Sequence, residues 1–427
     1  MKVNLSKSTD HPGIIAGLDP LRKEAIDSFN LNGLPNNRME AWKYSNINKV
    51  IKKDWVLESN IEELVQNQVK SNGISQKDGS IQVSLINGKV YKNSTHPINH
   101  NVMVCGLSEA SSKYQSLLET HLGNHACLRS GLTALNTVHI SDGLFIYIPD
   151  NTILEDPIYI HNKYQSGELR LFHPRSLIIM GKNSSATIIE DHENNTIPSD
   201  GSFFANSITE VFVDENARLD QYILQDDSSE DGNHVSSSFI TQNQASVYTR
   251  CTFTLNGSFV RNNVEVNMEG EGCESNLYGY SHLINQNQTD NHTHINHKVP
   301  NCLSNELYIG LLDDKSSGIF NGKVLVHRDA QKTNAFQSNK NILLSDNATM
   351  NSKPELEIYA DDVKCSHGAT TGQVNKEALF YLRSRGIPKA KAIPMLLFGF
   401  AYDVIEKVKN SKFKEEINAL VLKRLEN

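Results

Sequence analysis

The stretch DDVKCSHGAT, residues 361–370, places a thiol and an imidazole two positions apart beside two carboxylates. After Asp361 and Asp362 the alternation of apolar and polar residues changes phase, so Cys365 and His367 fall on one face of a strand. A bulge or a corner at the two aspartates would produce this change. Neutral imidazole and thiolate both bind iron or zinc, so Cys365 and His367 are candidate metal or cluster ligands. Two ligands do not complete a site; the others would come from elsewhere, or both residues are structural.

A second group of imidazoles lies in HLINQNQTDNHTHINHK, residues 282–298. His292 and His294 alternate along a strand and therefore share a face, and His297 follows closely. These three histidines are a second candidate metal site, which would make the chain a self-sufficient metalloprotein. The alternative is that they are core or solvent-exposed histidines, because no thiol or carboxylate partner stands in an ordered frame beside them.

Motifs of enzymatic chemistry are missing from the sequence. It contains no G-x-S-x-G elbow, no Walker A loop, no H-E-x-x-H and no G-x-G-x-x-G after a strand. Asp361 and Asp362 are neighbours, so on a strand they would face opposite sides and could not converge on one bond as an acid and base pair. The sequence therefore predicts a protein that is not an enzyme.

Composition narrows the class of protein further. Against 41 Lys and Arg stand 49 Asp and Glu, a formal charge of −8 over 427 residues, which argues against nucleic acid as the main partner. No signal peptide is apparent, and the longest apolar run, 393–405, is too short to span a bilayer. Six scattered cysteines without a C-x-x-C pair predict neither disulfides nor a zinc ribbon. We expect a soluble cytoplasmic protein without a membrane segment.

The first part of the chain, 1–139, reads as a mixed helical region. Asp19, as N-cap before a proline, opens a helix that runs to about residue 30. Further helices are predicted over 60–73 and over 108–122, the latter capped by Ser108. Residues 80–94 predict a hairpin around an Asn-Gly type I′ turn.

A repeat follows over 140–373, where short β-rich segments alternate with polar turns. One small residue recurs after each turn, at spacings of 31, 28, 28, 29 and 28: Ala186, Ala217, Ala245, Cys273, Cys302 and Ala330. Each period has room for two short strands, and none shows helical periodicity. This pattern predicts a mainly β fold with a right-handed parallel β-helix core, because coiling gives parallel strands their crossovers. A β-sandwich with chance spacing is the alternative.

The C-terminal part, 374–427, returns to helix. Asn375 caps a helix that Gly386 ends, and a second helix, bent or broken at Pro394, follows. The last helix, 411–427, carries apolar residues along one face. Such a helical domain would cap the coil or serve as a platform for a partner.

Several stretches together resemble one known family. KPELEIYADDVKCSHGATTGQVNKEALFYLRSRGI, residues 353–387, closely resembles the C-terminal signature of the SufD branch of the SufB/SufD family, whose members belong to the SUF machinery for iron–sulfur cluster assembly. GLPNNRMEAWKYSNI, ALNTVHISDGLFIYIP, HPRSLIIMG and NHTHINHKVPNCLSNELYIGLL fit the same family, so the resemblance covers nearly the whole chain. A SufB-like chain would carry a cysteine near NILLSDNAT and E-H-E-A-T in place of S-H-G-A-T, and this sequence has neither.

The resemblance implies a fold and a set of partners. The fold is the predicted β-helix between two helical regions. Its implied role is a non-catalytic scaffold that pairs with SufB through the β-helices, docks the ATPase SufC, and contributes to iron acquisition. An iron–sulfur cluster would be held transiently and shared with SufB, with His367 as the matching ligand and Cys365 as the neighbouring motif cysteine. The implied ATPase-docking residues are Leu379, Tyr381, Leu382, Arg383, Arg385, Gly386, Ile387, Met395, Phe398 and Phe400.

Three alternatives stay open. A carbohydrate-active β-helix enzyme is the competing function, against which stand the missing secretion signal and the lack of carboxylates clustered at coil spacing. The isolated chain could also pair with itself as a homodimer. Complexes of this family are associated with flavin, but the sequence contains no flavin motif.

Overall fold

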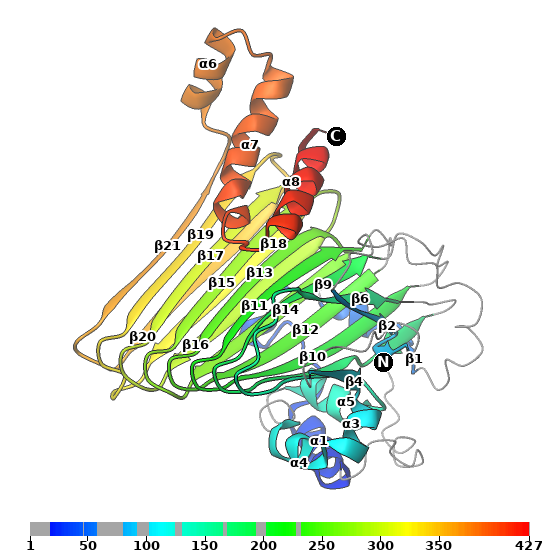
Figure 1. The fold of residues 1–427 in the computed structure, drawn as a ribbon. Coiled ribbons are helices and arrows are strands. Elements are labelled where there is room, and N and C mark those ends of the chain that lie inside the picture. The colour runs from blue at the N-terminus through cyan, green and yellow to red at the C-terminus, as the bar shows by residue number, and fades with distance from the viewer. Residues whose placement is uncertain are drawn as a thin grey trace.

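The computed structural model describes residues 18–45, 47–57, 80–91, 102–123, 130–164, 169–193, 202–227 and 232–426. Strands alternate along the chain between two long sheets, here called sheet A and sheet B (Figure 1). Sheet A contains, in spatial order, β20 (Thr349–Ile358), β18 (Ser317–Val326), β16 (Gln288–His297), β14 (Phe259–Met268), β12 (Gly232–Gln242), β10 (Phe203–Val213), β8 (Arg175–Met180), β5 (Leu144–Ile148) and β4 (Met103–Gly106), with β7 (Arg170–Phe172) and β1 (Val56–Leu57) at its side.

Sheet B has the same build on the other side of the coil. Its order is β21 (Lys364–Gly372), β19 (Asn334–Leu343), β17 (Leu303–Leu312), β15 (Glu274–Leu283), β13 (Val247–Asn256), β11 (Arg218–Asp226), β9 (Ser185–Glu193), β6 (Ile158–Lys163), β2 (Ile81–Ile86) and β3 (Lys89–Val90). Strands β5 and β6 pair in parallel with β8 and β9, and from β8 onward each strand pairs in parallel with the strand two positions along the chain. This is a parallel β-solenoid, so the predicted fold class is confirmed.

The turns that lead from sheet A to sheet B share one feature from the β8–β9 turn to the β18–β19 turn. Each of these six contains a residue in the left-handed region: Asn183, Asn216, Ala245, Gly272, Asn301 and Lys332. The next residue is buried and mostly small, which gives the stack Ser184, Ala217, Ser246, Cys273, Cys302 and Thr333. The predicted repeat is therefore confirmed. Three of the predicted stack residues are wrong, however: Ala186, Ala245 and Ala330 lie one to three residues away from the stacked positions Ser184, Ser246 and Thr333. The turns differ in length by a few residues, so equal spacing in the sequence does not mark equal positions in the stack.

Helices from the N-terminal region cover the outer face of sheet A. They are α1 (Asp19–Asn32), the 3₁₀ helix η2 (Glu40–Trp42), α2 (Ile47–Ile51), α3 (Leu107–Lys113), α4 (Gln115–His121) and α5 (Gly131–His139). A buried ion pair joins this layer to the sheet: the Arg175 guanidinium lies 2.6 Å from the Glu210 carboxylate and also donates to Asn136 and Thr137 of α5. Glu210 in turn accepts from the backbone N–H of Gly123 after α4. The helical layer is thus fixed to the solenoid.

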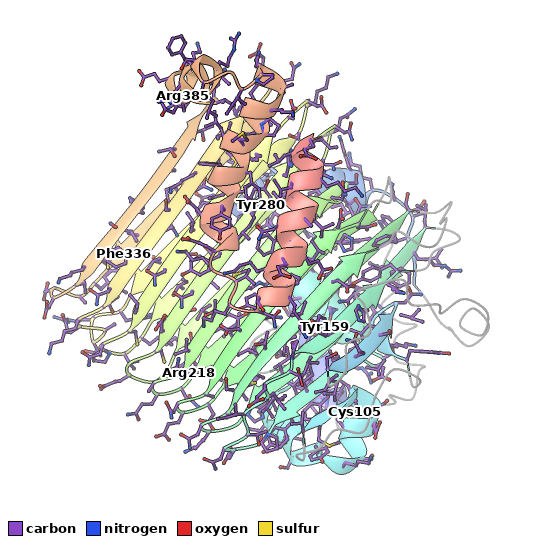
Figure 2. All side chains as sticks on the ribbon, turned by 45° about the horizontal axis from the view of Figure 1, so that its top comes forward. Cys105, Tyr159, Arg218, Tyr280, Phe336 and Arg385 are labelled. Atoms are coloured by element: carbon purple, nitrogen blue, oxygen red, sulfur yellow. The ribbon has the colours of Figure 1, made fainter. Side chains whose placement is uncertain are left out.

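Three C-terminal helices follow the last strand: α6 (Lys376–Ser384), α7 (Lys389–Ile405) and α8 (Ser411–Glu426). The apolar faces of α7 and α8 pack on outward side chains of sheet B, and Phe413 of α8 stacks on Tyr222 at 5.6 Å between ring centroids. Figure 2 shows Tyr280, another buried residue of this cluster, beneath the two helices. Burial of this continuous apolar surface is what holds the C-terminal helices on the solenoid.

Most predicted N-terminal elements exist, with different ends. The hairpin is confirmed, with Asn87 and Gly88 both at positive φ. The helix at residue 19 is confirmed, but Leu18 is its N-cap, so the capping role given to Asp19 is wrong. The single helix over 108–122 is wrong, because the backbone of Tyr114 leaves the helical region and separates α3 from α4. The helix over 60–73 lies outside the described residues, and α5 was not predicted.

The C-terminal predictions are closer. Asn375 caps α6 through a 2.9 Å bond from the Ala378 N–H, and Gly386 ends the helical stretch at φ +85°. Helix α7 runs through Pro394 without a break. Within the described ranges, no helix is long and apolar enough to cross a membrane. Strands β2 and β4 precede residue 140 yet extend the two sheets, so the three-part division at 140 and 374 stays a prediction.

Candidate functional site

The last turn of the solenoid has no further turn on it. Strands β20 and β21 end the spatial order of sheets A and B, and each pairs through one edge only within the described part of the chain (Figure 1). The corner at Asp361 and Asp362 carries the chain from one sheet to the other, which explains the change of phase in the sequence. Unpaired strand edges are surfaces to which another chain can add.

Cys365 and His367 point to the inside of this last turn. Their register partners on β19 are Ala335 and Gln337, both buried inside the coil, whereas Phe336 between them is 43% exposed on the outside. In-register parallel strands place paired side chains on the same face of the sheet, so Cys365 and His367 continue the inward row. They differ from their partners because nothing covers them: Cys365 is half-buried and His367 is exposed.

The two residues have different surroundings. Cys365 packs with Leu356 of β20 and Ala335, and burial raises the pKa of its thiol. The His367 ring has no hydrogen-bond or ion-pair partner among the described residues. No group of three His, Cys, Asp or Glu side chains able to hold a metal is found in the ranges described above. The described part of this chain thus presents two potential ligands at an open end and leaves the set incomplete.

Behind His367 lies a polar column that was not predicted from the sequence. Glu306, Gln337 and His367 occupy one register position on three successive strands of sheet B. The Gln337 amide donates to Glu306 at 2.6 Å, and both residues are buried. Burial raises the pKa of Glu306 to about 7, so this carboxyl sits near its titration midpoint at neutral pH. The signal in the sequence was the spacing of 31 and 30 residues, which matches the repeat.

The three histidines of β16 do not form one cluster. His292 and His294 lie on the outward face of sheet A, as their alternation predicted, and His292 Nε2 lies 2.8 Å from the Asp290 carboxylate. His297 is on the inward face, fully buried, with its Nε2 2.9 Å from the Ser304 hydroxyl. Burial lowers the pKa of His297 to about 4. The sheet therefore separates His297 from the other two.

The predicted docking residues lie on the hairpin of α6 and α7, which projects beyond the strands, with Arg385 at its far end (Figure 2). No residue of α6 is buried. Tyr381 is 57% and Met395 is 53% exposed, and Phe380, which was not among the predicted residues, is 75% exposed. The others are exposed (Arg383, Arg385 and Gly386) or half-buried (Leu379, Leu382, Ile387, Phe398 and Phe400). Apolar rings held in solvent on a projecting hairpin are typical of an interaction surface.

Comparison with known proteins gives the same family as the sequence motifs. Residues 161–400 match the family model described as "SUF system FeS cluster assembly, SufBD core domain". Residues 11–160 match the model described as "SufBD protein N-terminal region". The two matches cover most of the chain, and the first contains the solenoid end and most of the hairpin.

Individual relatives agree with these models. A Synechocystis protein described as an iron–sulfur cluster assembly SufBD family protein is 28% identical over 395 residues, which is 91% of this chain and 86% of the relative. The SufD protein of Escherichia coli is 30% identical over 258 residues, 60% of each chain. The SufD protein of Bacillus subtilis is 28% identical over 300 residues, 69% of this chain and 67% of the relative. The chain therefore belongs to the SufBD family of the SUF iron–sulfur cluster assembly system.

Proposed function

We propose that this chain is a non-catalytic scaffold subunit of a cytoplasmic iron–sulfur cluster assembly complex. It pairs with SufB through the open end of the solenoid and docks the ATPase SufC on the hairpin of α6 and α7. A nascent cluster is bound transiently between the two solenoids, with His367 as this chain's ligand. Membership of the SufBD family supports a role in cluster assembly. The identity of the two partners and the ligand role of His367 are what we propose beyond that membership.

The observation that carries the proposal is the inward-facing, uncovered position of His367. A histidine of the earlier turns at this register would be sealed inside the coil, as Gln337 is. In the last turn, an inward-pointing side chain instead faces any protein that covers β20 and β21. The ligand set is incomplete within the described chain, so a second protein supplies the rest.

The ligand chemistry fits a cluster that is assembled and then released. An imidazole binds iron through a ring nitrogen as an uncharged ligand, which suits the role of His367 as a temporary ligand. The Cys365 thiol would lose its proton on binding, and its raised pKa makes that step less favourable than for an exposed thiol. We therefore assign the main ligand role to His367 and a supporting one to Cys365.

The hairpin of α6 and α7 offers the ATPase a surface that is connected to β21, the strand that carries His367. Only three residues separate β21 from α6. A force on the hairpin can therefore reach β21 and the solenoid end. Packed interfaces tend to switch between discrete arrangements rather than stretch, so nucleotide-driven movement of the ATPase would alter the SufB contact and expose its ligands.

Co-purification tests the assembly. The tagged full chain, co-expressed with SufB and SufC, is expected to retain both partners and to carry iron and sulfide, whereas the chain alone carries neither. Tyr381→Asp combined with Met395→Asp should remove SufC and leave SufB bound. Leu422→Asp is the matched control, because Leu422 is an exposed apolar residue of α8 and is not one of the predicted docking residues. Retention of SufC by the double variant, or its loss in the control, would refute the docking surface.

A further inference from the structure

A cavity of about 640 Å³ lies outside the solenoid, between the segment 37–45 and the outward face of β16, β18 and β20. Its size falls in the range of small-molecule sites, roughly 300 to 1,000 Å³. It lies on the opposite face of sheet A from the interior of the coil and shares no lining residue with the Cys365 and His367 site. Its walls belong to two parts of the chain more than 200 residues apart.

A network of buried charged groups lies beneath the cavity, and Asp290 of this network forms part of the lining. Arg261 of β14 donates to the Asp290 carboxylate at 2.5 Å and to the Ala41 carbonyl at 2.8 Å, and its guanidinium lies 3.6 Å from the ring centroid of Trp42. The Ser45 hydroxyl also donates to Asp290. Burial disfavours the charge on Asp290, but Arg261 and His292 outweigh burial and hold its pKa below the usual value. These contacts fix the segment on the sheet and preform the cavity.

His292 places an imidazole at the wall of this cavity. Its Nε2 lies 2.8 Å from Asp290 Oδ1, and its side chain is mostly buried. Burial lowers the pKa of His292, against the opposing effect of Asp290. An imidazole nitrogen can form a hydrogen bond with a hydroxyl group, so a ligand that meets this ring is expected to carry one.

Two of the cations that line the cavity form no ion pair with a described residue, although the charge of Lys43 helps to lower the pKa of Glu40. Lys353 is paired with Glu40 at 2.6 Å, and Arg261 is paired with Asp290. Arg38 and Lys43 have no ion pair with a described residue; Lys43 Nζ lies 5.3 Å above the ring of Tyr44. The chain as a whole has a formal charge of −8, so these two unpaired cations give the cavity a local excess of positive charge. It favours an anionic ligand, and an arginine beside a lysine suits a phosphate group.

We propose that this cavity binds a nucleoside phosphate. Arg38 and Lys43 take the phosphate groups, the His292 ring forms a hydrogen bond with a sugar hydroxyl, and the half-exposed ring of Tyr44 offers a stacking surface for the base. Inorganic phosphate satisfies only the first of these contacts, and a nucleoside only the others. The site is independent of the ligands at the solenoid end, so binding is measured on the full chain without its partners.

Isothermal titration calorimetry with ADP tests the proposal, with pyrophosphate and adenosine as the two partial ligands. ADP is expected to bind with one-to-one stoichiometry and at least tenfold more tightly than either partial ligand. The double variant Arg38→Ala and Lys43→Ala should weaken ADP binding at least tenfold and leave adenosine unchanged. His292→Phe should weaken ADP and adenosine but not pyrophosphate.

The control removes a comparable charge elsewhere. Lys298→Ala deletes a lysine that directly follows β16 and does not line the cavity, and the variant should bind ADP as the parent does. Arg38 and Lys43 are exposed, so the double variant should keep the parent's melting temperature. Absence of ADP binding, equal binding by the double variant, or pyrophosphate binding as tight as ADP would each overturn the nucleoside phosphate site.

Discussion

Replacing Glu306 by glutamine should change how stability depends on pH. Burial raises the pKa of this carboxyl to about 7, against 4.5 for the free side chain. Between these values the folded protein holds a proton that the unfolded chain has released, so the free energy of unfolding falls as pH rises through this window. A shift of this size is equivalent to about 3 kcal/mol. Glutamine keeps the shape and the bond with Gln337 but does not titrate, so Glu306→Gln loses this pH dependence.

The assay is urea denaturation of parent and variant between about pH 5 and pH 8. The free energies of unfolding of the two proteins should diverge as pH rises. At the alkaline end the variant should gain up to about 3 kcal/mol relative to the parent. Burial lowers the pKa of His282 and His297 to about 4, so both add a rise of stability with pH, but this contribution is the same in the two proteins and cancels in their difference. Glu271→Gln, in an exposed turn, is the control and should follow the parent. Parallel curves for parent and Glu306→Gln would refute the raised pKa.

Three further substitutions test how the helices are held. Asn375→Ala removes the cap on the Ala378 N–H and should destabilise α6 by about 1 kcal/mol, seen as faster amide exchange in that helix alone. Phe413→Ala should cost about 3 to 5 kcal/mol, because the ring is fully buried between α8 and sheet B, and limited proteolysis should then cut around the C-terminal helices. Glu210→Ala leaves the Arg175 charge buried and unpaired, which should cost about 3 to 5 kcal/mol and lower the melting temperature; Glu210→Gln should cost less.

The solenoid was predictable because its physical cause is repeated along the chain. A turn that needs a left-handed residue followed by a small buried one leaves the same mark about every 30 residues, as at Asn216 and Ala217 or at Asn301 and Cys302. The exact residue that stacks in each turn was not predictable, because turns of slightly different length can place a small residue at the same position in the stack. Helix α5 was missed because its core contacts come from sheet residues distant in sequence, such as Arg175.

The candidate site was also predictable only in part. Local alternation predicted that Cys365 and His367 would share a face, and the structure places them so. It could not predict that this face is the inside of an uncovered last turn, because that depends on where the stack ends. The alternation of His292 and His294 was equally correct, yet the carboxylate beside His292, Asp290, is buried under a segment some 245 residues earlier in the chain, a contact that Ser45 makes. No local pattern contains such a contact.

The most direct measurement of the central claim is the iron and sulfide content of the co-expressed complex carrying His367→Ala. The solenoids should still pair and the ATPase should still dock, because the ring has no partner among the described residues, so the purified complex keeps its composition while iron and sulfide fall to background. Ser366→Ala on the same strand and His327→Ala at an exposed turn should both keep the parent content. Normal iron and sulfide in the intact His367→Ala complex would contradict the ligand role and with it the proposed function of the solenoid end.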